Sequence, residues 1–142
     1  MRAGIIIYHP KRDSILTIYR FKKNESYYVL PGGQIENGEN PLRAAIREIK
    51  EELLLSFREE DLKLALTYGS GPSQHIYYFT TYNGWEELDI NGEEKERSHD
   101  QNIYEPTWVS LADFKSVTFK PTDLQEQILS FFHAKFEKDD TL

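Results

Sequence analysis

The sequence predicts an α/β fold, with a mixed β-sheet and helices packed on it, in a single domain of residues 1–142. Short β-branched or alternating segments recur along the chain, and two other segments have helical periodicity. Because strands and helices do not alternate as regular βαβ units, a mixed sheet is favoured over a doubly wound fold. The 142 residues, of which 39% are hydrophobic, suffice for one domain with its own core.

The predicted strands are short segments bounded by turn-forming residues. Residues 2–8 contain a β-branched run, residues 15–21 alternate, and the Asp13-Ser14 turn between them predicts a hairpin. A third strand, residues 27–30, ends at Pro31-Gly32-Gly33, which interrupts regular structure. Further strands are predicted at residues 64–67, 76–82 and 108–109.

Two helices are predicted, and the clearer one covers residues 40–53. Asn40 is a suitable N-cap, and Pro41 fits the first helical position, where no N–H donor is needed. One apolar stripe recurs at helical spacing, namely Leu42, Ala45, Ile46, Ile49 and Leu53. The polar stretch at 91–102 predicts a surface loop, and a helical turn is expected from Ser110 or Leu111 to Phe114. A C-terminal helix begins at Pro121-Thr122-Asp123, and its last residues, 138–142, are expected to fray.

Composition and charge argue against several functional classes. The absence of cysteine removes disulfides, thiol nucleophiles and thiolate metal sites. The net charge of −7 disfavours binding to a nucleic-acid polymer. No apolar run approaches the ~20 residues of a membrane span, and the N-terminus lacks the features of a secretory signal. We therefore expect a cytoplasmic protein that binds neither membranes nor nucleic-acid polymers.

The helix over residues 40–53 carries three carboxylates on one exposed face. At about 100° per residue, Glu48, Glu51 and Glu52 fall within an arc of roughly 100°. Like charges at this spacing repel, and acidic groups near a helix C-terminus face the negative end of its dipole. A hard cation such as Mg²⁺, Mn²⁺ or Ca²⁺ would offset this cost. Taken alone, the triplet has a simpler explanation as a solvated acidic face.

The loop before this helix strengthens the metal-site hypothesis. Gly32-Gly33 lets the backbone turn sharply and approach the helix or a cation. Glu39 stands nine residues before Glu48, so the loop can bring its carboxylate, or the Gly33 carbonyl, to the helix face. Arg47 is placed to orient the carboxylates without binding metal itself.

Residues 31–55 resemble the signature of the Nudix (MutT-like) hydrolase family, G-x5-E-x7-R-E-U-x-E-E-x-G-U, in which U is a bulky aliphatic residue. The matching positions are Gly33, Glu39, Arg47, Glu48, Ile49, Glu51, Glu52 and Leu55. Leu54 stands where the signature has its second glycine, which normally caps the helix in the left-handed conformation. Because leucine is disfavoured there, we expect the helix to continue to about Ser56 or to end with different geometry.

The resemblance implies a Nudix-like α/β/α sandwich and a metal-dependent pyrophosphohydrolase. Such an enzyme cleaves a nucleoside diphosphate linked to another moiety, as in a nucleoside triphosphate or ADP-ribose, by water attack on phosphorus. By matching positions, Mg²⁺ or Mn²⁺ would be held by the Gly33 carbonyl and by Glu48, Glu51 and Glu52, with Glu39 and Arg47 in support. The partner implied is a small-molecule nucleotide, and a homodimer is expected because family members often dimerise.

The residues that take a proton and recognise the substrate are less defined. The resemblance gives Glu48 and Glu52 catalytic roles, with Glu52 as a candidate base. Glu94, ahead of Glu93 and Glu96, is the first candidate from the polar loop, although a solvated loop is the simpler explanation for each of them. The candidate substrate contacts are Arg20, Lys22 and Lys23 for phosphates and Tyr27, Tyr28, Phe79, Tyr104 and Trp108 for base stacking. Surface charge explains the basic residues, and packing in the core explains the aromatic ones, without any contact to a substrate.

Other functions remain open at this point. A catalytically silent nucleotide-binding module can share the fold, although it has no need of three mutually repelling acids. An isomerase on the same scaffold, acting on a diphosphate-bearing substrate, would normally use cysteine or histidine-rich chemistry, and the chain has no cysteine. A DNA-binding regulator is disfavoured by the acidic charge.

Overall fold

Strand β1 (Arg2–His9) lies inside the sheet because its side chains are apolar on both faces. Ala3, Ile5 and Ile7 are buried in one apolar cluster, whereas Ile6 and Tyr8 are buried in the other. Among residues 1–84, 87–99 and 101–140, which the computed structural model describes, seven strands form one mixed sheet.

The sheet has the order β3-β2-β1-β6-β5, with β4 also paired to β1 and β7 also paired to β2. Its remaining strands are β2 (Ser14–Lys22), β3 (Glu25–Val29), β4 (Gly32–Gln34), β5 (Lys63–Tyr68), β6 (His75–Thr81) and β7 (Asn102–Ser110). The pairing of β1 with β6 is parallel, whereas the other pairings are antiparallel. This combination confirms the predicted mixed sheet.

The predicted hairpin of β1 and β2 is paired only near its turn. Tyr8 lies opposite Ile15 and His9 opposite Ser14, but the start of β1 pairs with β4 instead. The later part of β2 pairs with β3, where Ile18 lies opposite Val29. The two strands therefore separate like a fork, with the connection from β3 to β4 between them.

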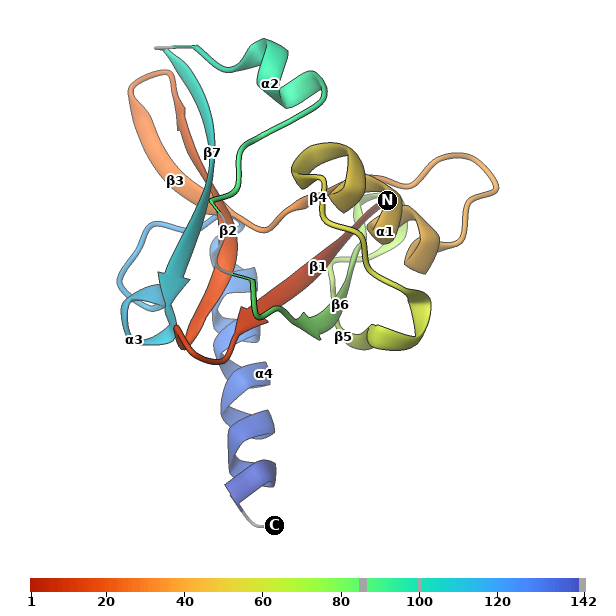
Figure 1. Cartoon of the computed structure of the whole chain (residues 1–142), viewed down its shortest axis with the longest axis vertical. Helices are drawn as coiled ribbons and strands as arrows, with labels where there is room; N and C mark the ends of the chain where they lie inside the picture. Colours follow the sequence, from red (N-terminus) through yellow and green to blue (C-terminus); the bar gives the residue numbers. More distant parts are fainter. Residues whose placement is uncertain (85–86, 100, 141–142) are drawn as a thin grey trace.

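Helices cover both faces of the sheet (Figure 1). Helix α1 (Pro41–Leu53) packs on β1, β4 and β6, whereas α3 (Leu111–Phe114) and α4 (Thr122–Asp140) contact β7 and β5. Helix α2 (Glu93–Arg97) lies against β7, and two short 3₁₀ turns occupy Glu59–Asp61 and Gly71–Ser73. The result is the α/β/α arrangement expected from the resemblance.

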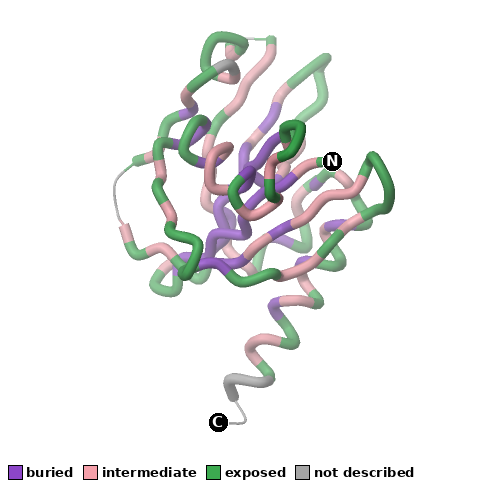
Figure 2. Tube along the Cα trace, turned by 90° about the vertical axis from the view of Figure 1, so that its right-hand side faces the viewer, coloured by how far each residue is buried: buried purple, intermediate pink, exposed green. Residues whose placement is uncertain are grey.

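Two apolar clusters hold the three layers together, and Figure 2 shows the buried residues gathered in the interior of the molecule. The predicted stripe of α1 packs in one cluster, where Ala45, Ile49 and Leu53 are buried. Leu124 and Ile128 of α4 are buried in the other. The C-terminal part of α4 extends beyond the sheet (Figures 1 and 2). In the described part of the chain, no helix combines the length and apolar character needed to cross a membrane.

Several elements differ from the prediction. The expected loop at 91–102 contains α2, and the strand expected at 108–109 is the nine-residue β7. β7 is long because it pairs with β2 along its whole length, a long-range contact that local composition does not reveal. The expected interruption at Gly32-Gly33 forms the short strand β4, and α4 remains helical through residues 138–140, with 141 and 142 outside the described residues.

Helix α1 begins and ends sharply. The Asn40 side chain accepts a hydrogen bond from the Leu42 N–H at 2.8 Å, as expected of an N-cap. At the other end Leu54 adopts the left-handed conformation (φ 58°, ψ 24°), and its N–H donates to the Lys50 carbonyl. The expected continuation to Ser56 is therefore wrong, because Leu54 takes the conformation that glycine would take and is 61% exposed.

We expect Leu54→Gly to raise the free energy of unfolding by about 1 kcal/mol, because glycine relieves the left-handed strain and little packing is lost. The measurement is urea denaturation of the two proteins. Leu54→Ala keeps the Cβ strain and should stay within ~0.5 kcal/mol of the parent. Equal destabilisation by both changes would show that the leucine side chain, and not its backbone, determines this helix end.

Candidate active site

A cleft of about 700 Å³ lies at the fork between β1 and β2, bounded by α1 on one side and by β2, β7 and α2 on the other. It brings together five of the predicted site residues from α1 and β4, which are Gly33, Arg47, Glu48, Glu51 and Glu52, together with Glu94 from α2. The lining residues are Arg2, Ile18, Arg20, Val29, Leu30, Gly32, Gly33, Gln34, Glu36, Arg47, Glu48, Glu51, Glu52, Asn91, Gly92, Glu94, Arg97 and Tyr104.

The three helix carboxylates differ in exposure, which corrects the prediction of one exposed face. Glu51 is exposed and Glu48 half-buried, but Glu52 is only 5% exposed. Glu52 is covered by a segment from outside the helix, in which Asn91 lies over the C-terminal end of α1. The Asn91 backbone N–H donates to the Glu52 carbonyl at 2.7 Å, and its side-chain amide donates to the Glu51 carbonyl at 3.0 Å. These bonds also satisfy carbonyls that a helix end leaves free.

Gly33 makes room for the carboxylate of Glu48. Pairing with Ala3 of β1 fixes Gly33 beside α1. A Cβ atom built on Gly33 would overlap the Glu48 carboxyl group, which occupies the space a side chain would need. Glycine is therefore required here for close approach of a side chain to the backbone.

Arg47 connects the loop before α1 to the carboxylates. Its guanidinium donates two hydrogen bonds to Glu39, from Nε to Oε2 at 2.7 Å and from Nη2 to Oε1 at 2.9 Å. It also donates to Glu48 Oε1 at 3.0 Å, to Glu51 Oε2 at 3.3 Å and to the Gln34 carbonyl at 3.0 Å. Such a forked pair fixes orientation as well as distance.

The pairing of Arg47 with Glu39 changes the proton affinity of both groups. Hydrogen bonds from Arg47, followed by one from the Glu36 backbone N–H, lower the pKa of Glu39 to about 2. The hydrogen bond to Glu39 likewise raises the pKa of Arg47. Both groups are therefore charged across the physiological range, and Glu39 secures the turn that leads into the helix.

Glu52 is a buried carboxyl group, and one of its oxygens lacks a partner in the described residues. This oxygen, Oε1, is buried and accepts no hydrogen bond there. Burial, together with repulsion from Glu94 and Glu48, raises the pKa of Glu52 to about 8. Burial also raises the pKa of Glu48, against the opposing effect of Arg47. Glu48 and Glu52 of α1 and Glu94 of α2 thus lie near enough for their charges to repel one another.

The donors in this cluster fit a hard divalent cation, because all of them are oxygen atoms. The unpartnered Oε1 of Glu52 is the observation that points to a cation. No three Asp, Glu or His side chains among the described residues already form a converged ligand set. Arg47 engages one oxygen of Glu48 and one of Glu51, which leaves each carboxylate a second oxygen.

Glu94 and Arg97 lie three residues apart on α2, and both line the cleft. Gly92, whose φ is 73°, turns the chain from Asn91 into this helix. Sequence reasoning missed Asn91 and Arg97, although Asn91-Gly92 is a turn-forming pair. Of the other two candidate acids from this segment, Glu96 is exposed and does not line the cleft, and the side chain of Glu93 is outside the described part.

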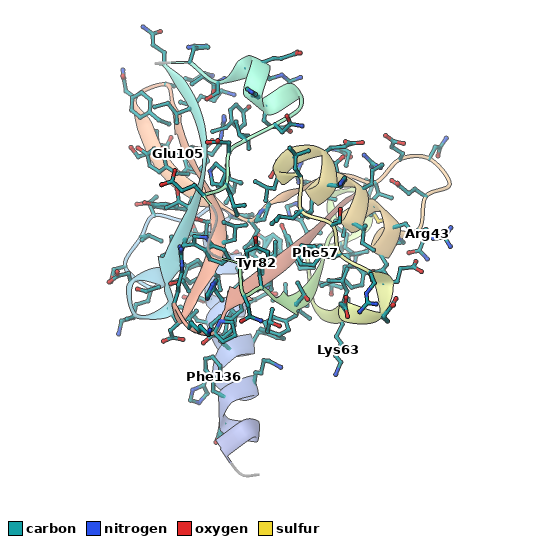
Figure 3. The ribbon with its side chains drawn as sticks, viewed as in Figure 1. Arg43, Phe57, Lys63, Tyr82, Glu105 and Phe136 are labelled. Carbon is teal, nitrogen blue, oxygen red and sulfur yellow. The ribbon has the colours of Figure 1, made fainter. Side chains whose placement is uncertain are left out.

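The candidate substrate contacts are divided by the fold. Arg20 and Tyr104 line the cleft, whereas Lys22 and Lys23 are exposed near the turn from β2 to β3. Phe79 packs on Phe131 of α4, Trp108 stacks on Tyr82, and Tyr27 and Tyr28 lie outside the lining. The two arginines of α1 also point in different directions. Arg47 lines the cleft, whereas Arg43 extends outward to the exposed Glu59 (Figure 3).

The family model of the NUDIX domain matches residues 1–133, which is most of the chain. The chain belongs to the NUDIX family. It is 28% identical over 116 residues to putative nudix hydrolase 1 of Caenorhabditis elegans, a match that covers 80% of this chain and 29% of that protein. This NUDIX chain therefore spans less than a third of that curated relative.

Solved structures support the NUDIX fold. A C. elegans Ap4A hydrolase binary complex has a TM-score of 0.70 at 20% identity, covering 97% of this chain and 99% of that one. A MutT structure from work on Aliivibrio salmonicida and Vibrio cholerae has a TM-score of 0.66 at 18% identity, covering 91% and 95%. At these identities the likeness extends to the fold of the NUDIX domain alone.

The raised pKa of Glu52 predicts how stability depends on pH in metal-free protein. Between 4.5, its ordinary value, and about 8, the folded state holds a proton that the unfolded state releases. The free energy of unfolding should therefore fall as pH rises through this window, by up to ~1.4 kcal/mol per pH unit.

This dependence can be measured by thermal melting in chelator between pH 5 and pH 8. Glu52→Gln should flatten the decline, because the variant has no group to titrate at that position. Glu51→Gln, which removes an exposed carboxylate next to it, should retain the decline. The same slope in the parent and in Glu52→Gln would contradict the assignment.

Proposed function

We propose that this chain is a metal-dependent pyrophosphohydrolase that cleaves a nucleoside diphosphate linked to another moiety, through attack of water on phosphorus. The observation that carries the proposal is the buried carboxyl group of Glu52, whose Oε1 has no hydrogen-bond partner among the described residues and which lies near Glu48 and Glu94 in an open cleft. Carboxylates gathered in this way destabilise the free protein, as expected of a group kept for ligand binding or catalysis.

Glu48, Glu51, Glu52 and the carbonyl of Gly33 would hold Mg²⁺ or Mn²⁺. When bound, such a cation offsets the negative charge of the phosphates and lowers the pKa of a water molecule. Membership of the NUDIX family and the all-oxygen donor set both support this assignment. Arg47 and Glu39 support it by keeping the carboxylates in place.

Two carboxyl groups are candidates for the base that takes the proton from water. Glu52 is buried with a pKa of about 8, so in the free protein near neutral pH it would have to lose its own proton before it could accept one from water. Glu94 comes from α2 on the other side of the cleft and raises the pKa of both Glu48 and Glu52 by its charge. A base that enters from a separate element can act while the helix carboxylates bind metal.

Candidate substrates follow from the chemistry and from the named relatives. They are a nucleoside triphosphate, ADP-ribose and Ap4A, the last because a structural relative is an Ap4A hydrolase. A cytoplasmic location and assembly as a homodimer are further proposals, which the sequence and the family resemblance suggest.

The first test incubates the protein with each of these substrates and Mg²⁺ or Mn²⁺ and separates the products by chromatography. A nucleoside triphosphate would release pyrophosphate or phosphate, whereas ADP-ribose would give AMP and ribose 5-phosphate, and Ap4A would give two nucleotides. Turnover should require metal, and Glu52→Gln should lower kcat by roughly 100-fold or more. Glu60→Gln, a change at an exposed acid outside the cleft, should leave it unchanged. Glu94→Gln should lower kcat without weakening metal binding if Glu94 is the base. Absence of turnover together with retained metal binding would favour the silent binding module.

Gly33→Ala provides a second test, because a methyl group there displaces the Glu48 carboxyl group and not the backbone. Stability should change by less than ~1 kcal/mol, since the end of a flexible side chain can move, whereas kcat should fall roughly tenfold or more. The measurements are thermal melting and the same assay.

Gly38→Ala is the matched control, because Gly38 has a φ of 77° and no neighbouring atom in the way. Its backbone strain should lower stability by about 1 kcal/mol while kcat stays within about threefold. If Gly33→Ala kept full activity, the contact with Glu48 would have no part in catalysis.

A further inference from the structure

Arg20 is a buried cation on the wall of the cleft opposite α1. It lies within β2, is 6% exposed and lines the cleft. Among the residues that the structure describes, its guanidinium makes one hydrogen bond, from Nη1 to the Ile103 carbonyl at 3.4 Å. It also lies over the ring of Tyr104, 3.4 Å from the centroid, and forms no ion pair with a described Asp or Glu.

These contacts offset only part of the cost of burying a guanidinium. A buried charge normally has an ionic partner, because removal from water is costly. Stacking on an aromatic ring and one long hydrogen bond to a neutral carbonyl are weaker interactions. A guanidinium carries five N–H donors, so most of them remain available to a ligand in the cleft.

The sheet places Arg20 away from the carboxylates. Ile18 lies opposite Val29, and the chain then continues to Gly32 and Gly33 in the direction away from Arg20. Arg20 is two residues beyond Ile18 on the same face of β2, about 7 Å further from Gly33 along the strand. A group bound at Arg20 is therefore separate from one bound beside Glu48.

We propose that Arg20, held flat against Tyr104, binds a phosphate group of the substrate beyond the linkage cleaved at the carboxylates. The preferred substrates then carry a chain of three or more phosphates. This inference rests on the proposed function and narrows its substrate class. The planar guanidinium suits two-point recognition of phosphate oxygens, and its position on an inner strand fixes that geometry.

A phosphate is favoured over a neutral base because it supplies the charge that Arg20 lacks. A base can accept hydrogen bonds from a guanidinium but leaves the buried positive charge uncompensated. Tyr104 has one ring face against Arg20, and its backbone N–H donates to Ser98 at 3.2 Å, just beyond α2. The stacked pair is thus joined to the segment that carries Glu94 and Arg97.

The binding test uses wild-type protein in chelator, so that it depends on neither metal nor turnover. Inorganic tripolyphosphate is titrated while the Nε–H resonance of Arg20, assigned from through-bond spectra, is followed by NMR. We expect a saturable shift that guanosine does not produce. No shift with tripolyphosphate, or an equal shift with guanosine, would overturn the proposal.

The kinetic test compares Arg20→Gln with Lys22→Gln, which removes the same charge from an exposed site on the same strand. Arg20→Gln should raise KM roughly tenfold or more for nucleoside triphosphate and Ap4A and less than about twofold for ADP-ribose. Lys22→Gln should change neither value by more than about twofold. Equal effects of Arg20→Gln on both substrate types, or none on either, would overturn the proposal.

The two tests separate this inference from the proposed hydrolase activity. Wild-type turnover with no selective effect of Arg20→Gln would retain the hydrolase and reject the phosphate site. A tripolyphosphate shift at Arg20 without turnover of any substrate would retain the site and reject the hydrolase. If Arg20→Gln fails to fold, the NMR titration of the wild-type protein decides the question.

Discussion

The guanidinium of Arg47 is the group on which the arrangement of the cleft depends. It joins three segments, because its hydrogen bonds reach Glu39 in the loop, the Gln34 carbonyl at the end of β4, and Glu48 and Glu51 on its own helix. An arginine suits this position because its planar donors are fixed relative to one another. Without it, the loop and the carboxylates of α1 would lose the hydrogen bonds that hold them in fixed positions relative to one another.

The carboxylate cluster illustrates a conflict between stability and function. Burial of Glu52 near Glu48 and Glu94 raises its pKa to about 8, so the free protein is less stable at higher pH than it would be without this group. Natural proteins retain such unfavourable clusters at sites of binding and catalysis. The cost is tolerated here because two large apolar clusters hold the sheet between its helices.

The fork between β1 and β2 creates a cleft with two chemically different walls. On one side, α1 and β4 supply carboxylates and a closely approaching glycine. On the other, β2 and β7 supply Arg20 and Tyr104 at directly paired positions. A phosphorylated substrate with bound cations has both kinds of charge, and each wall complements one of them. Asn91 secures the polar segment over the end of α1, and Glu94 from this segment also lines the cleft.

The sequence by itself determined the local elements and the family signature. Asn40, Pro41 and the apolar stripe defined α1, and the spacing from Gly33 to Glu52 indicated the family, because each of these signals lies within one short segment. Tertiary structure alone decided that Glu52 is buried, that Arg20 rather than Lys22 enters the cleft, and that the segment after residue 91 forms a helix and a long strand. Each of these depends on contacts between segments that are distant in the chain, and the secondary-structure propensity of a segment depends only on its own residues. Leu54 shows the same limit, because the packed end of α1 imposes a backbone conformation that leucine disfavours.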